Sequence, residues 1–129
     1  MFNKMKQVIH TDRAPKAIGP YSQGIVVGDL LFTAGQVGLN PSTGELATSV
    51  EDQVIQIMEN LRGIAEQAGT SLENAVKTTI FLADLSHYAI VNEVYGRYFA
   101  VTPPVRSTVE VSKLPINALV EIEAIFLIP

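Results

Sequence analysis

The stretch PPVRSTVEV, residues 103–111, and the run VEIEAIF, residues 120–126, are the most informative guides to how this chain folds. β-branched and apolar residues predominate in both, which predicts two largely buried strands near the C-terminus. Each strand nevertheless carries a charge, Arg106 in the first and Glu121 in the second. A buried guanidinium or carboxylate is costly unless it is paired, so both residues call for a functional or an interface role.

Further strands precede these two. The dipeptide Gly28-Asp29 separates two apolar runs and favours a tight β-hairpin, because both residues tolerate positive φ. The segment 14–24 is rich in proline and glycine and is expected to be an irregular loop. Six strands are expected in all, at residues 8–10, 25–27, 30–34, 75–82, 106–111 and 119–128.

Two amphipathic helices complete the pattern. Thr48 and Glu51 form a capping box that begins the first helix, and Gly69 ends it. Ser86 is expected to cap the second helix, which Pro103 stops. Each helix has one apolar face; in the second it consists of Val91, Val94, Tyr95, Tyr98 and Phe99.

These elements predict a two-layer α+β domain in which both helices cover one face of a six-stranded mixed sheet. Residues 1–129 are expected to form a single domain, with residues 1–4 as a short N-terminal extension. The other sheet face then remains uncovered, and alternation along residues 119–128 gives it a mixture of aliphatic and acidic side chains. Such a face is typical of a subunit interface, so a closed homo-oligomer is expected.

Composition excludes several classes of function. A net charge of −4 without a basic run argues against nucleic acid as a partner. The absence of cysteine rules out disulfides and thiolate nucleophiles, and His10 and His87 stand too far apart in unlike contexts to predict a metal site. No apolar run reaches the length of a membrane span, so a soluble, cytoplasmic protein is expected. The sequence contains neither a glycine-rich phosphate loop nor a Gly-x-Ser-x-Gly elbow.

Arg106 and Glu121 have two interpretations each. Arg106 shares a strand face with Thr108, so a guanidinium and a hydroxyl there could hold a small carboxylate; the alternative is a structural Arg–Glu pair at an interface. Glu121 could act as a general base or orient water, or it could simply partner an arginine. Glu123 is interpreted as an interface or solvated acid.

Three further residues are weaker candidates. Tyr21 lies in the rigid loop GPYSQG and could cover a pocket, or could plug the end of the core. Gly35 could offer backbone N–H groups to an anion, although a glycine at a strand end commonly marks a bulge. Asn92 could face a ligand or satisfy helix backbone.

The chain from Met5 onward resembles the reactive intermediate deaminase family, also called the YjgF/YER057c/UK114 family. The resemblance rests on RAPKAIGPYSQG from Arg13, LFTAGQVG from Leu31, FLADL from Phe81, VNEVY from Val91, PPVRSTVEV and VEIEAI. It implies a chorismate-mutase-like fold, assembled as a homotrimer with active sites between subunits. It also implies hydrolysis, without a cofactor, of 2-iminobutanoate and 2-iminopropanoate to 2-oxo acids and ammonia. These imines and their enamine tautomers are reactive intermediates released by pyridoxal-phosphate-dependent dehydratases.

By this resemblance, Arg106 clamps the substrate carboxylate and Glu121 positions or activates the attacking water. Tyr21 lines the pocket, Gly35 offers backbone contact, and Asn92 lies near the substrate. The chain departs from the family pattern in having Thr108 and Ala34, where many members have cysteine and serine. Thr108 can still hydrogen-bond the substrate, but thiol-dependent behaviour is put in doubt.

Three alternatives remain open at this stage. The first is a binding module, in which a regulatory trimer holds a small carboxylate without turnover. The second is an endoribonuclease or translation inhibitor, against which the acidic charge balance argues. Chorismate mutase activity is a fold-level analogy alone, and it ranks last.

Overall fold

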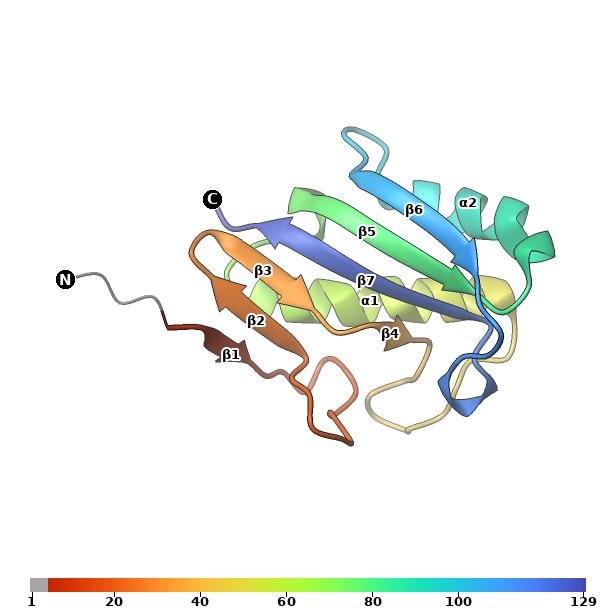
Figure 1. Ribbon diagram of the computed structural model, residues 1–129, viewed down its shortest axis with the longest axis horizontal. Coiled ribbons are helices and arrows are strands. Elements are labelled where there is room, and N and C mark those ends of the chain that lie inside the picture. Colours follow the sequence, from red (N-terminus) through yellow and green to blue (C-terminus); the bar gives the residue numbers. More distant parts are fainter. Residues whose placement is uncertain (1–4) are drawn as a thin grey trace.

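The computed structural model describes residues 5–129 and is organised around the long C-terminal strand β7. Six strands lie in the order β1-β2-β3-β7-β5-β6, and the two-residue β4 pairs with β7 beyond the end of β3 (Figure 1). The strands are β1 Gln7–Ile9, β2 Gly24–Val27, β3 Leu30–Thr33, β4 Gln36–Val37, β5 Ala75–Leu82, β6 Val105–Glu110 and β7 Val120–Leu127.

The sheet is mixed because one of its connections is a helical crossover. β5 and β6 are parallel and are joined through the helix α2, whereas every other strand pair is antiparallel. β2 and β3 form the predicted hairpin, in which Val27 pairs with Leu30 and Gly28 adopts a φ of 59°. The predicted strands are confirmed to within one residue at each end, and β4 is an additional strand that the pattern did not indicate.

Both helices cover the same face of the sheet, as predicted. α1 (Val50–Gln67) lies across the back of the sheet in Figure 1, and α2 (Tyr88–Gly96) lies behind β6. Their apolar faces meet alternate residues of β7 and β5 in one continuous core. Its largest fully buried apolar side chains are Phe126, Leu31, Ile57, Met58, Leu61, Ile64, Leu72, Ile80, Leu82, Ile122 and Val54. The two-layer α+β fold class is confirmed.

The helix boundaries differ from the prediction in three places. Ser49, not Thr48, caps α1, because its hydroxyl accepts the N–H of Asp52 at 3.0 Å. Ser86 does not cap α2; it lies in the short turn η2 (Leu85–His87), whose cap is the carboxylate of Asp84. α2 also ends at Gly96, well before Pro103, so the buried Phe99 belongs to the turn that follows the helix.

The second face of the sheet carries no helix, and apolar side chains are exposed on it. Alternation directs the residues of β7 that face away from α1 onto this open face, among them Glu121 and Glu123. Its exposed large apolar residues include Phe32, Val105, Val109 and Leu127.

No helix within residues 5–129 is long and apolar enough to cross a membrane. The predicted extension, residues 1–4, lies outside the described residues.

Candidate functional site

Arg106 lies on the helix-covered side of the sheet, where its guanidinium contacts the aromatic rings of two tyrosines of α2. Its register partner on β5 is the buried Thr78, which fixes the side of the sheet from which Arg106 projects. The guanidinium carbon lies 5.0 Å from the ring centroid of Tyr95 and 5.6 Å from that of Tyr88. Its Nη2 also donates to the hydroxyl of Tyr88 at 3.0 Å. Cation–π contacts of this kind contribute about 0.5–1 kcal/mol each at accessible sites.

Within residues 5–129, no carboxylate forms an ion pair with Arg106. Tyr95 does not neutralise the positive charge of Arg106 either. Burial raises the pKa of the Tyr95 hydroxyl, which therefore keeps its proton at neutral pH. That hydroxyl lies 2.6 Å from the Oγ1 of Thr78, which fixes the ring beneath the guanidinium. A positioned arginine whose charge is not balanced by the chain itself is suited to an external anion.

Asn92 and Thr108 belong to the same neighbourhood as Arg106. Asn92 follows Tyr88 by four residues and precedes Tyr95 by three, so it lies on their side of α2, where it is exposed. Thr108 shares the helix-facing side of β6 with Arg106, and its buried hydroxyl has no hydrogen-bond partner among the described residues. A guanidinium, an amide and a hydroxyl are thus gathered between β6 and α2.

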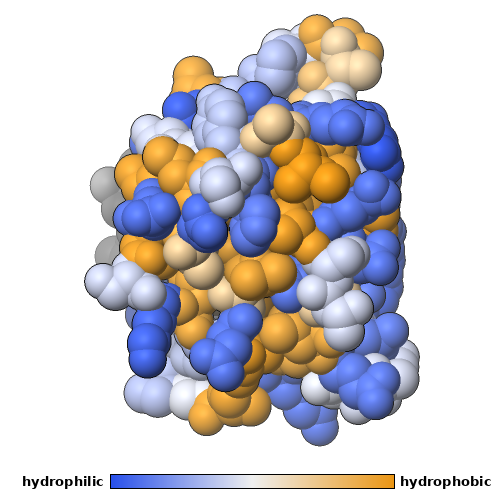
Figure 2. All heavy atoms as spheres, turned by 90° about the vertical axis from the view of Figure 1, so that its right-hand side faces the viewer, coloured by the Kyte–Doolittle hydropathy of each residue, from blue (hydrophilic) through white to orange (hydrophobic). Residues whose placement is uncertain are grey.

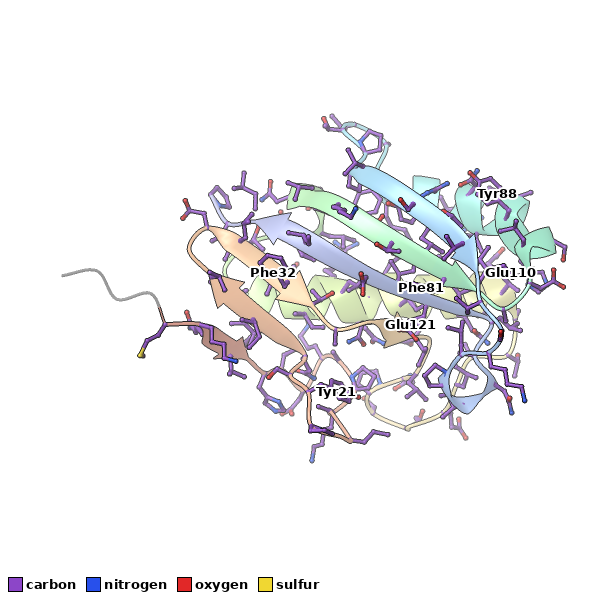
Figure 3. The ribbon with its side chains drawn as sticks, viewed as in Figure 1. Tyr21, Phe32, Phe81, Tyr88, Glu110 and Glu121 are labelled. Carbon is purple, nitrogen blue, oxygen red and sulfur yellow. The ribbon has the colours of Figure 1, made fainter. Side chains whose placement is uncertain are left out.

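Glu121 projects from the opposite side of the sheet. Its register partner on β5 is Phe81, which alternates with the buried Ile80 and Leu82, and Figure 3 shows the two side chains close together on the open face. Burial, and then the negative charge of Glu123, raise the pKa of the Glu121 carboxyl. This environment moves the pKa of Glu121 in the direction of neutral pH, which helps a carboxylate to accept and return a proton.

Gly35 makes room for the Glu121 carboxylate. A Cβ atom at position 35 would lie only 2.8 Å from the Cδ of Glu121 and would also overlap one of its oxygens. Any larger residue would therefore displace the acid. The sequence prediction assigned Gly35 a backbone contact with an anion, and the structure adds this steric role, which strand-level reasoning missed.

A pocket of about 330 Å³ opens beside Glu121. Its side chains are apolar apart from this acid and the hydroxyl of Tyr21, and within the described residues Glu121 is its single charged group. The phenol of Tyr21 reaches it from the loop before β2, where the Tyr21 hydroxyl lies 3.4 Å from the N–H of Ile18. The lining residues are Ile18, Tyr21, Ala34, Gly35, Val37, Leu39, Pro115, Ile116 and Glu121.

Gln23 holds the Tyr21 loop at its base. Its side-chain oxygen accepts the N–H of Thr11 at 2.7 Å, and its Nε2 donates to the carbonyls of Thr11, Ala14 and Pro15 at 2.9–3.2 Å. The amide is 3% exposed, so one side chain replaces the backbone ladder that a regular strand would provide. The loop that carries Tyr21 is fixed at both ends while its tip remains exposed.

The six predicted site residues fall into two groups on opposite faces of one sheet. Tyr21, Gly35 and Glu121 line the same pocket on the open side. Arg106, Thr108 and Asn92 lie on the helix side. One chain therefore does not bring Arg106 and Glu121 together, which also excludes the interpretation of Glu121 as the partner of Arg106 within a chain.

Sequence reasoning missed the two tyrosines that hold Arg106. Tyr88 and Tyr95 are seven residues apart, a spacing that places both on one side of a helix and could have indicated an aromatic platform.

The described residues contain no group of three or more histidine, aspartate or glutamate side chains arranged to hold a metal ion.

Comparison with known proteins gives consistent matches over nearly the whole chain. Residues 11–128 match the family model described as Endoribonuclease L-PSP. The RutC family protein PH0854 of Pyrococcus horikoshii is 50% identical over 94% of this chain and 97% of its own length. Reactive Intermediate Deaminase A of Arabidopsis thaliana, a chloroplast protein, is 47% identical over 93% of this chain and 65% of its own.

A solved structure of Escherichia coli TdcF with bound serine superposes with a TM-score of 0.91. It is 43% identical, and the match covers 94% of this chain and 98% of that one. The range that the family model matches includes Tyr21, Arg106 and Glu121. The chain belongs to the reactive intermediate deaminase family, which includes the proteins called RutC and YjgF.

Proposed function

We propose that this protein is a cytoplasmic deaminase that hydrolyses 2-imino acids to 2-oxo acids and ammonia without a cofactor. The observation that carries the proposal is Arg106, which two tyrosine rings hold while no carboxylate of residues 5–129 pairs with it. A planar substrate carboxylate fits the guanidinium fork. The deaminase named in Arabidopsis and the serine-bound TdcF structure support a small amino-acid-like substrate.

The substrates proposed are 2-iminobutanoate and 2-iminopropanoate, the products of pyridoxal-phosphate-dependent dehydratases acting on threonine and serine. Both carry the carboxylate that Arg106 requires, and both present an electrophilic carbon beside it. Their side chains are one or two carbons long, which the pocket beside Glu121 accommodates. An enzyme acting on them removes reactive intermediates faster than spontaneous hydrolysis does.

In the proposed reaction the group around Arg106 binds the substrate, and the group around Glu121 activates water. Arg106 holds the carboxylate, and Glu121 orients a water molecule toward the iminium carbon and takes one of its protons as the C–O bond forms. Glu121 then returns that proton to nitrogen. The C–N bond breaks as Glu121 takes the remaining hydroxyl proton, the carbonyl forms, and the departing ammonia takes that proton from Glu121 to leave as ammonium. The iminium ion and water yield a 2-oxo acid and ammonium, so atoms and charge balance. The raised pKa of Glu121 suits this exchange.

The two groups become one site when the Arg106 side of one subunit meets the Glu121 side of a neighbour. We propose that the chain forms a homotrimer with such a site at each junction. A ring of heterologous contacts has this geometry, because each subunit presents a different surface to each neighbour. The exposed apolar residues of the open face, including Phe32 and Val109, support burial by another copy.

The test measures 2-oxo acid production while threonine dehydratase generates 2-iminobutanoate from threonine. We expect acceleration over spontaneous hydrolysis by the wild type. Arg106→Ala should lose roughly 30-fold or more of kcat/KM, the lower end of the about 2–5 kcal/mol that removal of a charged anchor costs. Glu121→Gln should lose about 100-fold or more in kcat with KM nearly unchanged.

Arg97→Ala is the matched control, because Arg97 is an exposed arginine that pairs with Glu93 at 3.2 Å and with Glu51 at 4.0 Å. It should retain full activity. No acceleration by an assembled wild type would refute the proposal, and tight binding of a small carboxylate in that case would favour the regulatory binding module. Cleavage of RNA by the same preparation would favour the activity that the family model's description names.

A further inference from the structure

The segment that closes the Glu121 pocket has an unusual backbone. In the turn η3 (Pro115–Asn117), Ile116 has φ 54° and ψ 28°, and Asn117 has φ 59°. Asparagine tolerates the left-handed region, whereas a β-branched residue rarely adopts it. Apart from Ile116 and Asn117, every residue with a positive φ in residues 5–129 is a glycine. The chain therefore keeps a bulky aliphatic side chain at a position where asparagine or glycine would be more stable.

That side chain faces the pocket mouth and not the core. Ile116 is 50% exposed and lines the pocket together with Ile18, which is 89% exposed, and Tyr21. Figure 2 views the end of the molecule that carries this turn and shows apolar side chains at the surface among hydrophilic ones. Strain at a functional site points to a role for the strained residue.

We propose that Ile116 is a specificity-determining residue, whose side chain forms the apolar wall that contacts the side chain of the imine. This inference rests on the proposed function. It adds that the site prefers 2-imino acids with neutral aliphatic side chains to those with an acidic side chain. An apolar contact with one more methylene is worth about 10- to 200-fold in kcat/KM.

Charge supports the same preference. Glu121 is the one charged residue among the described pocket residues, so a carboxylate on the substrate side chain would meet a like charge and an apolar wall. Ile18 and Ile116 provide no donor on their side chains to compensate. A lysine at position 116 would supply the missing positive charge and remove part of the apolar wall.

The experiment compares imines generated by amino-acid oxidases from leucine and from glutamate. It measures the ratio of kcat/KM for these two imines in the wild type, Ile116→Lys and Ile116→Asn. Val101→Lys is the matched control, because Val101 is 95% exposed and lies outside this pocket. We expect the leucine-to-glutamate ratio to fall about tenfold or more in Ile116→Lys. It should fall less in Ile116→Asn and remain unchanged in Val101→Lys.

Ile116→Asn also guards against a folding artefact, since asparagine accepts the left-handed backbone and should raise the melting temperature. An unchanged ratio in both variants, with an active wild type, would overturn the inference and leave the deaminase proposal standing. Dissociation of the assembly by either variant, seen by its mass in solution, would show that Ile116 is an interface residue and would also overturn it. A wild type inactive on every imine would refute the deaminase proposal itself.

Discussion

Two variants of this protein that are each strongly impaired should restore activity when they are mixed. Arg106→Ala removes the anchor on the helix side of the sheet, and Glu121→Gln removes the acid on the open side. If each site takes Arg106 from one subunit and Glu121 from its neighbour, a mixed ring contains junctions in which both residues are intact. Neither variant alone contains such a junction.

The expected recovery follows from the arrangement of the ring. In a random equal mixture, half of the subunits that present the arginine side are intact there, and half of their neighbours are intact on the acid side. About a quarter of wild-type activity should return. In a ring of three selected to contain both variants, one junction is always intact, so about a third should return. The difference between these two values reports the size of the ring.

The assay uses two affinity tags on co-expressed variants, successive purification on both tags, and 2-oxo acid production from 2-iminobutanoate. A mixture of Arg106→Ala with the double variant Arg106→Ala/Glu121→Gln is the control, because no junction in it has both residues intact. Mixed rings that remain as inactive as their parents would show that the two residues do not meet across a junction, and the proposed composite site would be wrong.

Three further results are expected. Gly35→Ala should lower kcat about 100-fold, because its Cβ would push the Glu121 carboxylate from its position, while the melting temperature changes little; full activity would contradict the steric role of Gly35. Glu121→Gln should be more stable than the wild type at neutral pH. The folded chain holds the Glu121 proton more tightly than the unfolded chain does, so stability is greatest below the ordinary pKa of 4.5 and falls as pH rises through the raised folded value. Melting temperatures of the two proteins should converge at low pH, and a constant difference would refute this assignment. Gln23→Leu should cost about 2–4 kcal/mol in the free energy of unfolding, because it leaves buried backbone groups of the Tyr21 loop without partners. Urea denaturation measures this loss, and a cost below about 0.5 kcal/mol would show that water replaces the amide.

Periodicity was sufficient to predict the sheet and helices because burial on one face enforces it. Alternation in β7 and the helical spacing in α1 survive tertiary packing, since each keeps its apolar side toward the same core. Helix ends were less predictable. Thr48 and Ser49 are both good caps, and only the backbone geometry decides between them; α2 ends at Gly96 although no proline follows for several residues.

The candidate site was predictable residue by residue but not as an arrangement. Alternation correctly placed Arg106 and Thr108 on one strand face, and it placed Glu121 on one face of its own strand. It gives no relation between faces of different strands, because that depends on strand order and register. The aromatic platform under Arg106, the close approach of Gly35 to Glu121 and the left-handed backbone of Ile116 all depend on tertiary contacts or turn geometry.

The unbalanced charge of Arg106 has a consequence for how the reaction ends. In the proposed reaction the 2-oxo acid keeps the carboxylate of the imine. Hydrolysis would change the reacting carbon and would leave the carboxylate bound to Arg106, which Tyr88 supports. Product should therefore compete with substrate for Arg106 as it accumulates. Acetate, formate and citrate carry the same group, so kinetic measurements on this protein belong in buffers free of small carboxylic acids.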